Sequence, residues 1–258
     1  EDGMGTLLKA YARDVKNYIA LNKEVTSVEE EKGLYKVNYI DTSNKESFDL
    51  YAKMLVITVS IGVLQHWIKE KKIKLAEEKV KAINNIKMGY LNKNILVMDE
   101  RFFTDNNIRS FTHINIRSNR LNRDASFLAV EMNNKHYLIN FVGGNWSLQY
   151  EKRGTAFARN DSLRILASAF GDDVYDLCLD SYLSRWAQDK YFLGAYSSAL
   201  KNNFDSRLEL SKPLARNLYR AGEEVRYSAT ELSYHTHITG ALNSGFITAN
   251  KVIRELEH

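Results

Sequence analysis

The order of apolar and polar positions predicts a chain that mixes helices with strands. Near the start, apolar side chains recur at helical spacing within residues 5–18, at Leu8, Tyr11, Val15 and Tyr18. The β-branched run MLVITVSIGVL, residues 54–64, is long enough for a strand that is buried on both faces. The remaining pattern predicts strands over residues 18–22, 24–31, 33–52, 93–103, 124–132, 136–144 and 217–223, and helices over residues 76–86, 161–171 and 240–256.

The ends of two predicted helices carry recognisable signals. Asp161 is placed to cap the helix over residues 161–171, and Gly171 is placed to end it. Around the start of the last helix, small residues gather at Gly240, Ala241, Ser244 and Gly245. The preceding strand and this helix resemble the end of a doubly wound sheet, so the predicted fold class is α/β with a mixed order of elements.

The composition is that of a globular protein, and it narrows the function classes. The 258 residues are 44% apolar and allow one large domain or two smaller ones. Because no stretch reads as a membrane span or a secretory signal, we expect a cytoplasmic protein without a membrane partner. The net charge of +4 is mild and no nucleic-acid motif accompanies the basic runs, so no nucleic-acid partner is expected.

Metal and nucleotide motifs are sparse in the sequence. Cys178 is the only cysteine, which excludes an internal disulfide and a multi-cysteine metal site. His235 and His237 flank Thr236 without a third ligand nearby, so no metal site is expected. The stretch GMGTLL supplies two glycines before a helix, but Leu8 stands where a dinucleotide-binding turn needs its third glycine. The pyrophosphate loop of a dinucleotide site is therefore not predicted here.

Four stretches, taken in order, carry a family resemblance. They are VITVSIGVLQ at 56–65, AINNIKMGYLNKNILVMDERFF at 82–103, RWAQDKYFLGAYS at 185–197, and YRAGEE with THITGALNSG within 219–245. Together they resemble the flavin-dependent amine oxidases, and VSIGVLQ is most similar to the polyamine oxidases. The resemblance covers nearly the entire chain but only the C-terminal portion of a family chain. It implies an incomplete FAD-binding doubly wound domain over residues 1–64 and 194–258, and a substrate domain with a mixed sheet and flanking helices over residues 65–193.

The resemblance assigns three residues to catalysis. Lys93, in LNKNIL, matches the lysine that holds a water against flavin N5, where a cation steadies developing anionic charge. Tyr196, in GAYS, matches an aromatic residue of the substrate cage, whose ring face attracts a cationic centre. His237 falls where relatives carry the second cage aromatic, and its imidazole departs from that pattern.

The resemblance also implies a noncovalent FAD site. An unpaired backbone N–H at Ile238 would bind the flavin C2 carbonyl at the start of the last helix. Glu223 would lie near the ribityl–pyrophosphate stretch, and Trp186 and Tyr191 would border the flavin. Ala195 stands where monoamine oxidases carry the cysteine that bonds the flavin. The cofactor-binding residues implied in this way are Val25, Trp186, Tyr191, Gly222, Glu223, Ile238, Gly240 and Ala241.

The implied activity is oxidation of a polyamine-like amine. Hydride would pass from the carbon beside a neutral amine to flavin N5, the imine would hydrolyse, and oxygen would be reduced to hydrogen peroxide. One alternative is a catalytically incompetent fragment or subunit that acts as a structural or interaction module, with the N-terminal half on a separate chain. A second is an L-amino-acid oxidase or a methyl-lysine demethylase. An amino-acid oxidase needs an arginine for the substrate carboxylate, for which Arg117 and Arg120 are untested candidates.

Overall fold

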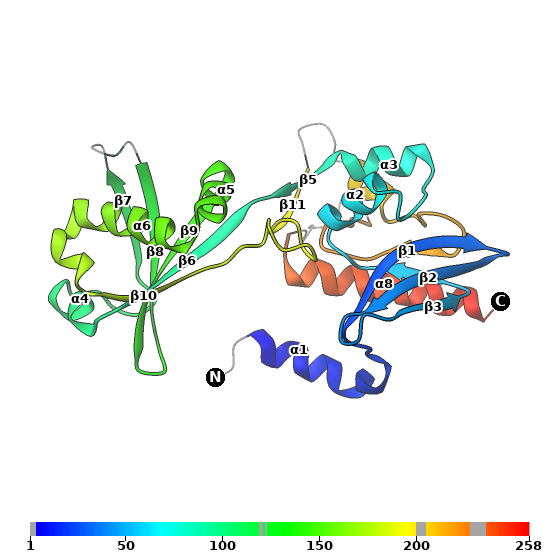
Figure 1. Cartoon of the computed structure of the whole chain (residues 1–258), viewed down its shortest axis with the longest axis horizontal. Helices are drawn as coiled ribbons and strands as arrows, with labels where there is room; N and C mark the ends of the chain where they lie inside the picture. Colours follow the sequence, from blue (N-terminus) through cyan, green and yellow to red (C-terminus); the bar gives the residue numbers. More distant parts are fainter. Residues whose placement is uncertain (1–3, 119–120, 122, 200–204, 228–235, 258) are drawn as a thin grey trace.

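The computed structural model describes residues 4–118, 121, 123–199, 205–227 and 236–257, and it shows two lobes joined by a waist (Figure 1). We call residues 91–183 the middle lobe, and residues 23–89 with 205–227 and 236–257 the terminal lobe. Helices and strands are mixed in both lobes, as the sequence predicts. Within the described residues, no helix is long and apolar enough to cross a membrane.

The terminal lobe combines an antiparallel meander with a short parallel strand pair. Its elements are β1 (Lys23–Glu31), β2 (Leu34–Asp41), β3 (Ser47–Ala52), β4 (Leu55–Ile57), α2 (Ile61–Lys69), α3 (Glu77–Asn84), β5 (Ile86–Gly89), α7 (Asp205–Glu209), β12 (Leu218–Arg220) and α8 (Ile238–Leu256). Strands β1, β2 and β3 form the meander, and β12 runs parallel to β4. Val28, Ile57, Ile83 and Leu218 share one buried core, so segments far apart in the sequence make a single unit.

The apolar run over residues 54–64 is divided between a strand and a helix. Strand β4 covers only Leu55–Ile57, and α2 begins at Ile61. The cause is Ser60, whose Oγ accepts a hydrogen bond of 3.1 Å from the Val63 N–H and caps the helix. The prediction of one continuous strand is therefore wrong, because both elements are buried and the apolar pattern does not separate them.

The middle lobe is a twisted sheet with helices on one face. Its elements are β6 (Leu91–Met98), α4 (Glu100–Asp105), β7 (His113–Ser118), β8 (Arg123–Met132), β9 (Lys135–Gly143), α5 (Gly144–Arg153), α6 (Thr155–Phe170), the 3₁₀ helix η2 (Asp172–Tyr175) and β10 (Cys178–Leu183). The strand order is β10-β6-β9-β8-β7, and every described neighbour pair is antiparallel. The sheet is thus not the mixed sheet that the resemblance implied. Leu96, Phe127, Leu138 and Leu163 pack between the sheet and α6.

Two predictions in the middle lobe need correction. The strand expected over residues 93–103 ends at Met98, because the Asp99 carboxylate caps α4 by accepting from the Arg101 N–H at 2.9 Å. Asp161 does not begin a helix but lies inside α6, where its buried carboxylate pairs with Arg123 at 2.6 Å. Gly171 does end that helix, with a φ of 87°.

The waist is built from β5, which is the last element of the terminal lobe before β6, together with β11 (Tyr196–Ala199) and the segment 184–195. Strands β5 and β11 pair antiparallel and lie between the lobes in Figure 1. The predicted boundary between residues 64 and 65 falls inside α2, and Ile73, Ala82 and Ile86 pack in the core of the terminal lobe. Because α2 and α3 complete the core that β1 and β4 begin, residues 65–89 are described here with the terminal lobe, and the domain boundaries stay a prediction.

The first helix lies apart from both lobes in Figure 1. It consists of α1 (Met4–Ala12) and the 3₁₀ helix η1 (Arg13–Tyr18), which together cover the helical segment predicted over residues 5–18. The strand predicted over residues 18–22 does not form, and regular strand begins at Lys23. The apolar side chains of this helix are exposed, with Leu8 61% and Tyr18 88% accessible. The apolar positions do fall on a helical segment, as predicted, but within the described residues their side chains do not join a buried core.

Candidate functional site at the waist

Tyr196 lies on a glycine that the strand pairing places opposite it. In the β5–β11 ladder Tyr196 faces Gly89, and the Ala195 N–H donates to the Gly89 carbonyl at 3.0 Å. A Cβ added to Gly89 would come within 2.9 Å of Tyr196 Cε2, so only glycine lets the ring lie flat against this strand. The half-buried phenol is thereby fixed just before β6, the strand that carries Lys93.

Lys93 is tied to the waist through its backbone. The Lys93 N–H donates to Ser184 Oγ at 2.9 Å, and the Ser184 N–H donates to the Lys93 carbonyl at 3.0 Å. Its side chain lies on the sheet face opposite the buried Asn92 and Asn94, and its Nζ is 5.6 Å from the centre of the Phe141 ring. The ammonium is thus on an open face of the sheet and within reach of cation–π attraction.

The segment that follows Ser184 carries the two predicted flavin-bordering aromatics. The Trp186 ring packs edge-on against Phe192, with ring centres 5.1 Å apart. The Tyr191 hydroxyl donates to Glu24 Oε2 at 3.0 Å, and Lys190 Nζ pairs with the same oxygen at 2.7 Å. The hydrogen bond from Lys190 lowers the pKa of Glu24. Because Glu24 precedes Val25 in β1, this cluster brings the aromatic segment to the strand predicted to meet the adenine.

The Glu223 carboxylate connects three segments of the waist. Its Oε1 accepts from the Ser197 N–H at 2.7 Å, and its Oε2 accepts from Ser197 Oγ at 2.7 Å and from the Thr236 N–H at 2.8 Å. These bonds join β11, the turn after β12 and the residues before α8. The predicted cofactor-binding acid therefore holds the substrate-side strand against the start of α8.

The start of α8 presents backbone donors. His237 is the N-cap residue, and the Ala241 N–H makes a 3.2 Å bond to the His237 carbonyl. The N–H groups of Ile238, Thr239 and Gly240 precede that bond and have no acceptor within the helix. Ile238 is 50% exposed, so this end of a 19-residue helix is open to a ligand. The helix dipole makes it attractive to anionic groups.

A buried ion pair holds the turn that carries Gly222 and Glu223. Arg220 Nη2 lies 2.5 Å from Glu224 Oε1, and their side chains are 0% and 2% exposed. A Cβ on Gly222 would overlap the Glu224 carboxylate, so glycine is required for that carboxylate to fold back. The Gly222 N–H also donates to Ser244 Oγ of α8 at 2.9 Å. The turn is thus fixed to both β12 and α8.

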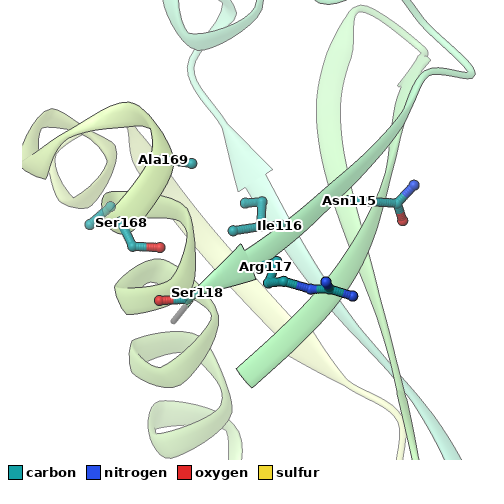
Figure 2. A pocket seen from close by; sticks show the side chains of 7 residues that line it. Asn115, Ile116, Arg117, Ser118, Ser168 and Ala169 are labelled. Carbon is teal, nitrogen blue, oxygen red and sulfur yellow. The ribbon is translucent and has the colours of Figure 1, made fainter. Parts of the chain in front are cut away.

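The remaining candidates lie elsewhere or outside the described residues. Arg117 is on edge strand β7 and forms an exposed ion pair of 3.5 Å with Asp124. Both residues line a cavity of about 640 Å³ that also reaches Phe141. On the other side of β7 a second cavity lies against α6, and Figure 2 shows the Arg117 side chain turned away from that helix. Arg120 and His235 lie outside the described residues.

Three residues that hold the waist together were missed by sequence reasoning. Ser184, Ser197 and Glu24 each bond a predicted site residue or its segment. Ser184 is separated from Lys93 by 91 positions, and Glu24 from Tyr191 by 167. No local spacing can reveal such pairs, and serine has no pattern that distinguishes a structural hydroxyl from a surface one.

The residues of this chain fit the ring end of a flavin. The N–H groups at the start of α8, which have no acceptor within the helix, are suited to a carbonyl oxygen that gains negative charge on reduction. Glu223 bonds Ser197, next to Tyr196, and the Thr236 N–H before that helix, and Ser184 bonds the Lys93 backbone at the start of the aromatic segment. A pyrophosphate group has no matching glycine loop in the sequence. The fit is therefore to one end of the cofactor.

Comparison with known proteins gives the family. Residues 1–253 match the model of flavin containing amine oxidoreductases, and the chain belongs to that family. Among curated relatives, it is 27% identical over 205 residues to lysine-specific histone demethylase 1 homolog 1 of Oryza sativa subsp. japonica, covering 78% of this chain and 23% of the relative. It is 26% identical over 259 residues to polyamine oxidase 5 of the same species, covering 98% and 48%.

Solved structures show the same fold. A putrescine oxidase A394C mutant superposes with a TM-score of 0.73 at 15% identity, covering 98% of this chain and 53% of that one. Cyclohexylamine oxidase from Brevibacterium oxydans IH-35A gives a TM-score of 0.73 at 16% identity, covering 96% and 51%. The chain thus spans about half the length of these structures and no more than half of the two curated relatives.

Proposed function

We propose that this chain supplies the flavin-ring end of an FAD-dependent amine oxidase that acts on a polyamine-like substrate. The observation that carries the proposal is that Glu223 bonds both Ser197, next to Tyr196, and the Thr236 N–H just before α8. The Lys93 backbone bonds Ser184, which begins the segment that leads to Tyr196. Of these residues, the family resemblance assigns Lys93, Tyr196 and Glu223 to flavin and substrate. When bound, FAD supplies the acceptor for the hydride removed from the amine.

Lys93 and α8 are proposed to stabilise negative charge on opposite sides of this chemistry. The Lys93 ammonium, on the open sheet face, provides the positive charge for the oxygen-dependent step. The Ile238 N–H, at the start of α8, provides a donor for the ring carbonyl. Tyr196 and His237 are proposed to contact the amine, with the phenol ring offering its face to the cationic centre. FAD is proposed to be held noncovalently, because Ala195 has no thiol to bond it.

The role of Lys93 can be tested with Lys93→Met in the flavin-loaded protein, with Lys135→Met as the matched control. Lys135 is an exposed lysine at the far end of β9. We expect reduction by amine to persist in Lys93→Met and reoxidation by oxygen to slow about 10²-fold, the typical effect of deleting one preorganised charge-stabilising group. The measurement is stopped-flow absorbance of the flavin. Reoxidation as fast as in the Lys135 control contradicts the assignment.

A second proposal is that the chain works as a subunit that needs a complementary nucleotide-binding half. Two observations favour it: the parallel sheet contains only β4 and β12 among the described strands, and apolar side chains of α1 and α8 are exposed, including Leu8, Phe246 and Ile253. Parallel sheets are normally covered and larger. Purified chain that carries flavin near one per protein contradicts this reading, whereas flavin uptake only with the complementary half supports it.

The remaining functional hypotheses differ in the class of substrate that is oxidised. Relatives include proteins named histone demethylase, polyamine oxidase and L-amino-acid oxidase. Arg117 lies in an exposed pair with Asp124. We favour an amine over an amino acid because the sequence motifs are most similar to the polyamine oxidases. Flavin reduction by putrescine or spermidine supports this choice. Reduction by L-amino acids or methyl-lysine peptides, with none by polyamines, contradicts it.

A further inference from the structure

The layer between strands β6 and β9 and helices α5 and α6 contains polar side chains where an apolar core is expected. Asn92 and Asn94 of β6 are fully buried, on either side of Lys93 in sequence. Asn140 of β9 and Ser147 and Ser162 of the helices complete the layer, and none is more than 1% exposed. Buried amides and hydroxyls carry a desolvation cost unless each polar atom is bonded.

Direct hydrogen bonds engage the amide nitrogens of this layer. Asn92 Nδ2 donates to the Ser147 carbonyl at 3.0 Å, which connects β6 to α5. Asn94 Nδ2 donates to the Ala158 carbonyl at 3.0 Å and to Ser162 Oγ at 2.9 Å, which connects β6 to α6. Asn140 Nδ2 reaches the same Ser162 Oγ at 2.8 Å. The two asparagines that flank Lys93 are thus each anchored to a different helix.

Within the described residues, three buried polar atoms of this layer lack a hydrogen-bond partner. Asn92 Oδ1, Asn94 Oδ1 and Ser147 Oγ are buried atoms to which the protein gives no hydrogen-bond partner. The Asn92 amide and Ser147 belong to one contact, because the amide nitrogen already bonds the Ser147 carbonyl. Amide oxygens accept hydrogen bonds, and a hydroxyl both donates and accepts. All three groups are uncharged, so their common complement is a small neutral molecule with two donors and two acceptors.

We propose that this layer binds internal water at Asn92 with Ser147 and at Asn94, and that the hydrated layer positions Lys93. A water that bridges Asn92 Oδ1 and Ser147 Oγ would supply a donor to the amide oxygen and satisfy the hydroxyl. On the buried face of β6, the layer then fixes the residues on either side of Lys93. Ser184 fixes the Lys93 backbone itself. Asn92, Asn94 and Ser147 are positioning residues, and this part of the inference rests on the proposed function of Lys93.

The water itself is tested with Ser147→Ala, with Ser47→Ala on exposed strand β3 as the matched control. If water bonds the Ser147 hydroxyl, its loss lowers the melting temperature by about 2–4 °C, the usual shift for one ordinary hydrogen bond in a chain of this size. If the hydroxyl is dry and unpaired, its removal raises the melting temperature, which would overturn the proposal. A high-resolution crystal structure gives a second test: density bonded to Ser147 Oγ and Asn92 Oδ1 supports it, and rotated, self-satisfied side chains contradict it.

The positioning role is tested in the flavin-loaded protein. We expect Ser147→Ala to slow reoxidation by oxygen severalfold without changing flavin affinity, because only the placement of Lys93 is disturbed. Unchanged reoxidation contradicts the link to Lys93. If the protein takes up no flavin, the proposed function fails, and the melting and crystallographic tests still decide whether the layer holds water.

Discussion

Loss of one partner from the Arg220–Glu224 pair should destabilise the protein strongly. The Glu224→Gln variant keeps the size of the side chain but leaves the Arg220 guanidinium buried without its counter-charge. Both side chains are almost completely inaccessible, so water cannot replace the lost carboxylate. Within the part of the chain that the structure describes, the guanidinium then keeps its 3.1 Å bond to the neutral Ile57 carbonyl. Removing one member of such a buried pair typically costs about 3–5 kcal/mol of unfolding free energy.

The assay is urea unfolding, with Glu30→Gln on exposed β1 as the control. In thermal unfolding of a chain of this size, the same loss of free energy lowers the melting temperature by roughly 6–20 °C. The double variant Arg220→Met with Glu224→Met should recover much of this loss, because it removes both charges together. A Glu224→Gln variant within about 1 kcal/mol of its control would refute the reasoning, since the scatter of ordinary substitutions is of that size.

Three further outcomes follow from the same contacts. Lys190 holds the pKa of Glu24 below its ordinary 4.5, so the stability that this pair contributes is complete above pH 4.5 and is lost as the pH falls further. The melting temperature of Glu24→Gln should therefore converge on that of wild type in acid. A difference in melting temperature that stays constant with pH would contradict this. Burial and the bond to Asp161 raise the pKa of Tyr150 to about 12, so stability should fall between pH 10 and 12 in wild type and less in Tyr150→Phe, as followed by circular dichroism. Leu8→Ser should change the unfolding free energy by less than about 0.5 kcal/mol, because Leu8 is 61% exposed; a larger loss in urea unfolding would show that α1 packs against the lobes.

Local patterns predicted the elements whose signals lie within a few residues. The hairpin of β1 and β2 alternates and is broken by a turn at Lys32 and Gly33, both with positive φ. The ends of α3 and α8 also agree with the sequence to within a few residues. Family motifs identified the segments that meet at the waist, although the roles of their site residues stay predictions.

Failures occurred where a distant partner or an unrecognised helix cap decides the structure. Asp161 has the chemistry of a helix cap, but Arg123 and Tyr150 draw it into a buried cluster inside α6. The run over residues 54–64 looked like one strand because apolar residues suit both a buried strand and a buried helix start. Asn94 is a polar residue in β6 whose burial is explained by its bonds to α6. For Asp161 and Asn94 the determining contact is distant in the sequence, whereas the break in the 54–64 run comes from the local cap at Ser60.

The central claim, that the start of α8 binds the flavin ring, is tested most directly with Ile238→Pro. Proline at the first helical position removes the N–H without breaking a helix, and His237 already has the extended conformation that precedes proline, with φ −119° and ψ 155°. Flavin affinity is measured by fluorescence titration against Ile238→Val, which keeps the N–H. Loss of a hydrogen bond to a charged acceptor predicts about tenfold weaker binding or more. Equal affinity in the two variants would contradict the claim.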